Sequence, residues 1–276
     1  MIYLYAHTNH KADLDSLRRM GALWKILRDE GIEAELLVND YRAQLAGREM
    51  GLPLATTIET ILDIDAVAQL GDSVVIDSSE EAPERLELYR QKFTRVLRLS
   101  SCSKEGDTID PFAPESYLFD PLYARAASEV KKERKVLIFR DADPEKELLA
   151  QAESFRGLGL ELYWGTYFYV KYEEALAELF DSIYESEEYE ELVITSHTVV
   201  TAMPQTALEA RAAGAAVIYL ERGETPVCLK ERFKGLGILQ VKMGDRSALQ
   251  RAMEEVKPTG DMLHPQEKFW VEKLQK

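Results

Sequence analysis

Short apolar runs alternate along this chain with longer stretches in which apolar residues recur at every third or fourth position. In the first half, the short runs predict β-strands at residues 2–6, 33–38, 73–76 and 95–99. The longer stretches predict helices at residues 14–30, 58–70 and 83–93. This order is typical of a mostly parallel sheet with helices on both faces.

The alternation stops in the middle of the chain and then starts again. Residues 100–121 are polar and contain prolines, which predicts a loop with at most a short strand at 117–119. Residues 122–130 lead into a charged run at 131–135, which marks either a domain boundary or a solvated helix end. Because the pattern restarts afterwards, we expect an N-terminal Rossmann-like domain over 1–130, a nucleotide-binding Rossmann-like domain over 136–260, and a C-terminal helix over 261–276 that packs back.

The second half repeats the pattern of the first. Strands are predicted at residues 136–139, 160–164, 192–195, 216–220 and 238–241. Helices are predicted at residues 144–155, 172–189, 204–213, 226–234 and 247–256. Asp143 is expected to cap the first of these helices, with Pro144 in its first turn. The predicted fold class is therefore α/β, with two Rossmann-like domains whose parallel sheets face each other across a cleft that holds a small molecule.

Charge and composition narrow the classes of partner. The chain has 276 residues and a formal net charge of −15, which repels phosphate backbones and argues against nucleic acid as the main partner. No stretch approaches the roughly 20 apolar residues that span a bilayer, and no signal-like segment opens the chain, so a cytoplasmic protein without a membrane span is expected. Two cysteines and four histidines lack metal-type spacing, so no metal site is expected.

Two turns of the first half carry groups suited to acid–base chemistry. The loop at residues 7–13 contains two histidines and Asp13, which suit a general base, or form a polar surface loop with Asp13 as a helix cap. It has no glycine-rich dinucleotide fingerprint, which disfavours a nicotinamide cofactor. Asp77 follows the strand at 73–76 and is interpreted either as a group that polarises a sugar hydroxyl or as a helix cap.

The second half contains two turns suited to a nucleotide. After the strand predicted at 192–195, hydroxyls, an imidazole and backbone N–H groups meet a helix start, and a carboxylate for ribose hydroxyls lies one turn in. The residues concerned are Ser196, His197, Thr198, Thr206 and Glu209. Ordinary capping and an exposed glutamate are the alternative. The next turn contains Arg222, Glu224 and Thr225, in which Arg222 pairs with a phosphate or forms a surface salt bridge.

Several of these stretches resemble a known family. Residues 192–200 (LVITSHTVV) and 207–220 (ALEARAAGAAVIYL), the strand that ends in Asp77, and the pair Asp143-Pro144 are similar to elements of the UDP-sugar hydrolase of pseudaminic acid biosynthesis. That family lies within the two-domain glycosyltransferase-B fold, together with the peptidoglycan GlcNAc transferase. If the activity is retained, the resemblance implies metal-free attack of water on the anomeric carbon of a UDP-sugar, with substrate-binding roles for the residues of the two nucleotide turns. No cofactor is expected.

The chain departs from the family pattern in its first turn. The family has a Gly-x-Gly-His ahead of an arginine, whereas Ser16 holds the histidine position here and only Arg19 of the pattern remains, as a substrate-binding residue. The family's glycine pair before Asp-Pro is Arg140-Asp141 here. His10 becomes the candidate base, with Asp13 or Asp77 assisting.

Two functions follow from this sequence. One is a nucleotide-sugar hydrolase or glycosyltransferase-like enzyme of surface-glycan or nonulosonic acid biosynthesis. The other is a non-catalytic relative that binds a nucleotide-sugar or a partner protein. The lost first-turn motif favours the second function, and the polar density of residues 7–13 favours the first. The sugar and the oligomeric state stay open.

Overall fold

The computed structural model describes residues 1–9, 13–103, 106–165 and 173–275. The chain forms two compact units, which are described separately. Unit 1 comprises Met1–Asn9, Ser16–Pro121 and Pro265–Lys276, and unit 2 comprises His10–Asp15 and Leu122–His264. The predicted domain limits stay a prediction. The units differ from them because residues 10–15 and 122–130 are part of unit 2 and the C-terminal Pro265–Lys276 is part of unit 1.

Unit 1 is built on a six-stranded parallel sheet with the order β3-β2-β1-β4-β5-β6. Its strands are β1 (Ile2–Ala6), β2 (Ala34–Val38), β3 (Thr56–Thr57), β4 (Ser73–Asp77), β5 (Arg95–Leu99) and β6 (Thr108–Ile109). All residues of β1 and β4 are buried, because both faces of the sheet are covered.

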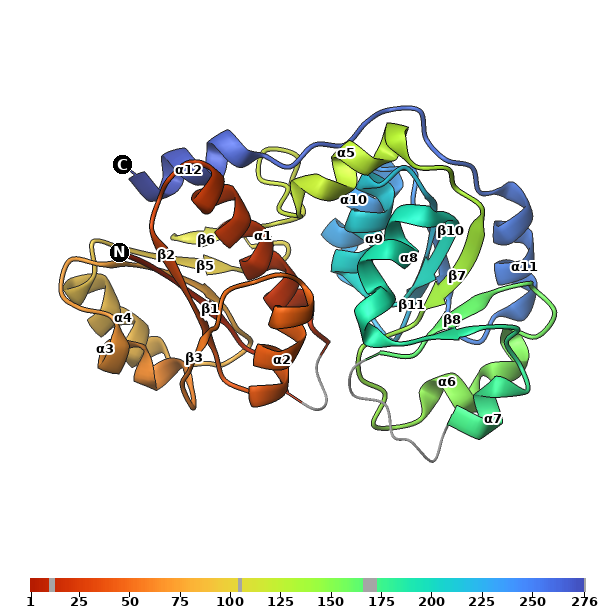
Figure 1. The fold of residues 1–276 in the computed structure, drawn as a ribbon, viewed down its shortest axis with the longest axis horizontal. Helices are drawn as coiled ribbons and strands as arrows, with labels where there is room; N and C mark the ends of the chain where they lie inside the picture. Colours follow the sequence, from red (N-terminus) through yellow and green to blue (C-terminus); the bar gives the residue numbers. More distant parts are fainter. Residues whose placement is uncertain (10–12, 104–105, 166–172, 276) are drawn as a thin grey trace. The chain divides into compact units, whose positions relative to one another are not determined.

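Helices cover both faces of the unit 1 sheet, with α1 and α2 on one side and α3 and α4 on the other (Figure 1). They are α1 (Asp15–Asp29), α2 (Tyr41–Glu49), the 3₁₀ turn η1 (Ile61–Asp63), α3 (Ile64–Val67), α4 (Pro83–Lys92) and the C-terminal α12 (Glu267–Gln275). On the face of α3 and α4, alternate residues of the central strands, such as Tyr3, Tyr5 and Ile76, form one buried cluster with Ile64 and Leu86.

Unit 2 has a second six-stranded parallel sheet, with the order β12-β11-β10-β7-β8-β9. Its strands are β7 (Arg134–Ile138), β8 (Glu161–Tyr163), β9 (Ile183–Tyr184), β10 (Ser196–Thr201), β11 (Ala216–Glu221) and β12 (Leu239–Lys242). Numbered by their place along each unit, both sheets have the same order, so the predicted α/β fold with two Rossmann-like sheets is confirmed.

The unit 2 sheet is also covered on both faces, with α8, α9 and α10 on one side and α6, α7 and α11 on the other (Figure 1). The helices are α5 (Pro121–Glu129), α6 (Glu147–Ala150), the 3₁₀ turns η2 (Ala152–Ser154) and η4 (Ser186–Glu188), α7 (Glu173–Ala177), α8 (Tyr189–Thr195), α9 (Pro204–Ala212), α10 (Val227–Gly235) and α11 (Arg246–Glu255). One core cluster joins Phe139, Leu162 and Ile218 of the sheet to Leu148 of α6 and Leu249 of α11.

Four sequence predictions were wrong in their extent. The helix predicted at 172–189 is interrupted, because Ile183 leaves helical geometry to pair with Leu162 as part of β9. The helix at 58–70 reduces to η1 and α3, and the helix at 144–155 reduces to α6 and η2. Residues 117–119 form no strand.

The fifth correction moves a predicted strand by one whole element. The apolar run at 192–195 is the last turn of α8, in which Tyr189, Leu192 and Val193 are buried at helical spacing. The strand begins at Ser196 and reaches its carboxyl end at Thr201.

Candidate functional site

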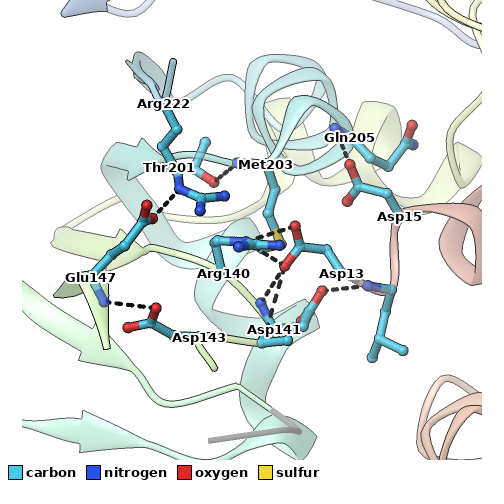
Figure 2. Close-up of polar contacts among 12 residues, drawn as sticks. Asp13, Asp15, Arg140, Asp141, Asp143, Glu147, Thr201, Met203, Gln205 and Arg222 are labelled. Atoms are coloured by element: carbon cyan, nitrogen blue, oxygen red, sulfur yellow. Dashed lines mark hydrogen bonds and ion pairs between the residues drawn. The ribbon is translucent and has the colours of Figure 1, made fainter. Parts of the chain in front are cut away.

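Strand order places the candidate site of unit 2. Its first strand, β7, lies between β8 and β10, so the chain winds in opposite directions from β7 and the order reverses there. Open α/β sheets bind ligands beyond the carboxyl ends of the strands at such a switch point. The residues that follow β7 and β10 therefore form the candidate site (Figure 2).

The turn after β7 offers donors to an anion, and the carboxylate of Asp13 occupies them. Its oxygens lie 3.0 and 2.9 Å from Nε of Arg140, and Oδ1 accepts from the backbone N–H of Asp141 at 3.1 Å and of Ala142 at 3.4 Å (Figure 2). Gly165 permits this turn, because its φ is +82° and a Cβ there would lie 2.7 Å from the carbonyl oxygen of Arg140.

Asp141 anchors the same segment from the other direction. It is fully buried, and its Oδ2 accepts from the backbone N–H of Leu14 at 2.8 Å. Its Oδ1 accepts from the hydroxyl of Tyr163 at 3.3 Å. Asp13, Leu14 and Asp141 therefore form a reciprocal contact between the N-terminal segment of unit 2 and the end of β7.

A second carboxylate meets the start of α9. Thr201 ends β10, and its hydroxyl accepts from the N–H of Met203 at 3.0 Å. Pro204 opens the helix, and the next N–H, of Gln205, donates to Oδ2 of Asp15 at 3.1 Å (Figure 2). The unpaired N–H groups and the dipole of a helix N-terminus favour an anion at this place.

Burial and the neighbouring charged groups shift the pKa of Asp13. Burial raises its pKa to about 7; Arg140 opposes this shift, and the nearby carboxylates of Asp141 and Asp15 add to it. A buried carboxyl that titrates near neutrality beside an arginine is a feature found often at functional sites.

Two further charged groups lie around the end of β7, and both have structural partners. Asp143 accepts from the N–H groups of Glu147 and Leu148, each at 2.9 Å, at the start of α6. The predicted cap position was wrong, because the N-cap of α6 is Lys146 and Pro144 precedes the helix. Arg222 forms an ion pair with Glu147, and its guanidinium lies 5.9 Å from the ring centroid of Phe139. Of the two interpretations of Arg222, the structure shows a salt bridge.

Ser196, His197 and Thr198 do not lie in the turn where they were predicted, because the strand assigned to 192–195 is helix. They form the amino end of β10, opposite the ligand-binding ends of the strands. The hydroxyl of Ser196 donates to the carbonyl oxygen of Leu192, and Nδ1 of His197 lies 2.9 Å from Oγ1 of Thr198. The strand-to-helix turn that the sequence placed at these residues lies at residues 202–203 instead.

Thr206 and Glu209 lie on α9 as predicted but belong to an internal network. Glu209 is 1% exposed; the hydroxyl of Tyr189 donates to Oε2 at 2.7 Å, and Nε2 of Gln205 donates to Oε1 at 3.0 Å. The same tyrosine hydroxyl lies 2.8 Å from Oγ1 of Thr206. These contacts fix α9 against α8, and the glutamate is buried rather than exposed. Further along, Thr225 is buried and hydrogen-bonded to Tyr219, and Glu224 is exposed.

In unit 1 the corresponding strand ends are closed by their own groups. Asp77, the last residue of β4, accepts from Nε of Arg19 at 2.6 Å and from its Nη2 at 3.1 Å, so two residues that were singled out separately from the sequence form an ion pair. After β1, the side-chain amide of Asn39 exchanges two hydrogen bonds with the backbone of Thr8, at 2.7 and 2.8 Å. His10 lies outside the described residues.

A cavity of about 530 Å³ lies elsewhere in unit 1, and no predicted site residue lines it. Its wall joins α4, β5, β6 and α12 and carries both charges, including Arg90, Arg95, Asp107 and Lys273. Among the described residues, no three acidic, histidine or cysteine side chains come together as a metal site. The described helices include none that is long and apolar enough to cross a membrane.

Four residues of the unit 2 site were not predicted as site residues from the sequence. Asp15 and Gln205 were not singled out, and Arg140 and Asp141 were noted only as a departure from a glycine pair. The signal was present in the spacing Asp13-x-Asp15, which places two carboxylates in one short segment. Their partners lie more than a hundred residues away, and no local pattern predicts such pairing.

No family model and no curated protein matches this chain in sequence. Solved structures share its fold. The UDP-GlcNAc 2-epimerase of Methanocaldococcus jannaschii, solved in complex with UDP-GlcNAc and UDP, has a TM-score of 0.59 at 13% identity over 98% of this chain and 97% of that chain. A putative UDP-N-acetylglucosamine 2-epimerase from Listeria monocytogenes has a TM-score of 0.57 at 11% identity over 98% of this chain and 94% of that chain.

A glycosyltransferase shares the fold with a slightly lower TM-score. SnogD from Streptomyces nogalater has a TM-score of 0.53 at 14% identity over 99% of this chain and 98% of that chain. At these identities the likeness shows the fold alone. The chain has the glycosyltransferase-B-like fold that these epimerases and glycosyltransferases share, which is the fold expected from the sequence. The UDP-sugar hydrolase of pseudaminic acid biosynthesis stays a prediction.

Proposed function

We propose that unit 2 binds the diphosphate of a UDP-sugar at the carboxyl ends of β7 and β10. The observation that carries this proposal is the set of donors at the switch point, which already hold two carboxylates. The guanidinium of Arg140 and the N–H groups of Asp141, Ala142 and Gln205 all donate to oxygens of Asp13 or Asp15. Donors that satisfy two carboxylates also suit the two phosphates of a diphosphate. The shared fold with an epimerase solved in complex with UDP-GlcNAc and UDP supports the choice of ligand.

The proposed reaction is hydrolysis of the UDP-sugar or transfer of its sugar, without a metal or a cofactor. In hydrolysis, a base takes a proton from water as the water oxygen bonds to the anomeric carbon. The bond from that carbon to the diphosphate oxygen breaks, and UDP leaves with the bonding electrons while the donors above stabilise its charge. His10 is the proposed base. Asp13 follows it in the same segment and assists once a diphosphate has replaced it on its donors.

A role in surface-glycan or nonulosonic acid biosynthesis, with the hydrolase of the pseudaminic acid route as the reaction type, is part of this proposal. Of the family's first-turn pattern only Arg19 remains, so this turn gives the pathway little support. The identity of the sugar is left open.

A non-catalytic nucleotide-sugar-binding or partner-binding protein is the second candidate. The observation that favours it is the ion pair of Asp77 with Arg19, in which both carboxylate oxygens are engaged within unit 1. Because both oxygens of Asp77 already accept from Arg19, the assisting role predicted for Asp77 loses support.

Calorimetric titration with UDP-GlcNAc at pH 8 tests the binding proposal. The wild type is expected to bind, and Arg140→Ala is expected to lose roughly 10- to 100-fold in affinity, the range for a hydrogen bond to a charged group. Arg140→Lys, which keeps the charge, is expected to lose less. Arg156→Ala is the matched control, because Arg156 is exposed in unit 2 and pairs with Glu153. Equal affinity of Arg140→Ala and the control would reject this site.

Release of UDP from UDP-sugars, followed for the wild type and for His10→Ala, separates the two candidates. A wild-type rate above background that falls in His10→Ala supports the enzyme. Equal rates at background level, in protein that binds UDP-GlcNAc, support the binding protein.

A further inference from the structure

The donors proposed for the diphosphate are filled by the protein's own chain. Asp13 takes the guanidinium of Arg140 and two consecutive N–H groups, and Asp15 takes the first N–H that follows Pro204 at the start of α9. Two carboxylates separated by one residue thus stand on the two donor groups of the site. A diphosphate presents the same arrangement of two linked anionic groups.

The segment is held there by more than its two carboxylates. The N–H of Leu14, between them, donates to Oδ2 of Asp141 at 2.8 Å, and Leu14 itself is 1% exposed. Asp141 is fully buried. The occupied state is therefore a defined packing arrangement, which a ligand must exchange for its own contacts.

We propose that Asp13 and Asp15 are internal competitors of the diphosphate, so that the segment Asp13–Asp15 must leave its donors before a nucleotide-sugar binds. This inference rests on the proposed function, since it concerns regulation of that same site. Only molecules in which the segment has left the donors bind the ligand. The apparent affinity is therefore the intrinsic affinity multiplied by the fraction of such molecules.

Protonation couples to this exchange. The groups that face Asp13 are the guanidinium of Arg140, the N–H groups of Asp141 and Ala142, and the carboxylates of Asp141 and Asp15. In place on these donors Asp13 has a pKa of about 7, raised mainly by burial. Displaced into water, its pKa returns to about 4. Displacement therefore releases a proton between these values, and ligand affinity rises with pH until about pH 7 and is constant above it.

UDP-GlcNAc is the suitable probe, because both its phosphates are esterified and neither titrates in this range. We would titrate the full chain at pH 6 and pH 8 in two buffers of different ionisation enthalpy. At pH 6 the wild type is expected to release about one proton per ligand bound. Asp13→Asn keeps an acceptor but does not titrate, so it is expected to release no proton and to bind with the same affinity at pH 6 and pH 8, whereas the wild type is expected to bind roughly tenfold more tightly at pH 8 than at pH 6. Asp181→Asn, an exposed aspartate of unit 2, is the matched control and should behave as the wild type.

Asp15→Asn gives an independent reading if Asp13→Asn does not fold, as judged by circular dichroism. It is expected to bind more tightly than the wild type while still releasing a proton. Wild-type affinity and proton release in both variants would overturn the competition and leave the proposed function standing. If neither the wild type nor the variants bind UDP-GlcNAc, the proposed function fails and this inference with it.

Discussion

The two sheets of this protein have the same strand order but finish their switch points differently. In unit 1, the end of β4 is closed by a bidentate pair of one acid and one base, Asp77 and Arg19. In unit 2, the ends of β7 and β10 meet Asp13, Asp15 and Asp141, with Arg140 as the basic partner. In unit 1 the charge of Asp77 is balanced by Arg19 of α1. In unit 2 three carboxylates accept from backbone N–H groups, with one arginine beside them.

This difference indicates which of the two equivalent strand ends is suited to bind an anionic ligand. A balanced ion pair lowers the energy of the folded state and leaves little to gain from a ligand. Where a carboxylate that holds such donors has its pKa raised to about 7, as Asp13 has, a ligand with fixed charge has an advantage over it. The same topology therefore supports a structural closure in unit 1 and an anion site in unit 2.

The largest effect is expected for the Arg19–Asp77 ion pair of unit 1. Arg19→Met leaves Asp77 buried without its cation, and the free energy of unfolding is expected to fall by about 3–5 kcal/mol. The double variant with Asp77→Leu is expected to recover most of this loss, since no charge is left unpaired. Urea denaturation of the two single variants and the double variant measures the coupling. Additive losses would mean that the pair does not close unit 1.

The next effect tests how the unit 2 donors are positioned. Gly165→Ala forces a Cβ to within 2.7 Å of the carbonyl oxygen of Arg140 and is expected to cost roughly 1–3 kcal/mol, together with UDP-GlcNAc affinity. Gly157→Ala is the matched control, because Gly157 also has positive φ, of +76°, but its Cβ would meet nothing within 4 Å. Equal thermal stability of the two variants would show that close approach to the β7 turn is unimportant.

A smaller effect concerns the support behind α9. Tyr189→Phe removes a donor from the buried carboxylate of Glu209 and is expected to lower the free energy of unfolding by about 1–2 kcal/mol. Tyr41→Phe, at a tyrosine that is 64% exposed, is the control. Should Tyr189→Phe leave stability unchanged while abolishing UDP-GlcNAc binding, the glutamate contacts the ligand and its assignment to the internal network is wrong.

A further expected effect is a pH dependence of stability that arises from Asp13 in unit 2. The folded pKa of Asp13 is raised to about 7, above the value of about 4 in an unfolded chain. Its contribution to stability is therefore fully present below pH 4 and is lost as the pH rises through 7. Denaturation midpoints of the wild type at pH 5 and pH 8, compared with those of Asp13→Asn, measure it. A variant with the same pH dependence as the wild type would contradict the raised pKa.

The alternation of strands and helices could be predicted from sequence because each strand of a covered parallel sheet is a short apolar run. Residues 2–6 and 95–99 were predicted with the bounds that the structure has. The run at 192–195 was misassigned for the same reason, since four apolar-rich residues fit a buried strand and the last turn of a buried helix equally well. Pairing of Ile183 with Leu162 is a tertiary contact that the acidic helical pattern around it conceals.

The site was predictable only in part. The carboxyl groups of Asp13 and Asp77 and the guanidinium of Arg19 were singled out from the turns in which they lie. The bonds from Asp13 to Arg140 and from Asp15 to Gln205 join parts of the chain that only the folded sheet brings together. Burial of Glu209 could not be read from α9, because the residue that covers it, Tyr189, belongs to a helix that was predicted as part strand.

Backbone amide NMR shifts of the deuterated, ¹⁵N-labelled chain on addition of saturating UDP-GlcNAc test the central claim most directly. The amides of Asp141, Ala142 and Gln205 are expected to shift together with ligand concentration, because each exchanges a carboxylate for a phosphate oxygen. Unchanged amides at these three positions in protein that binds the ligand would place the diphosphate elsewhere and contradict the account.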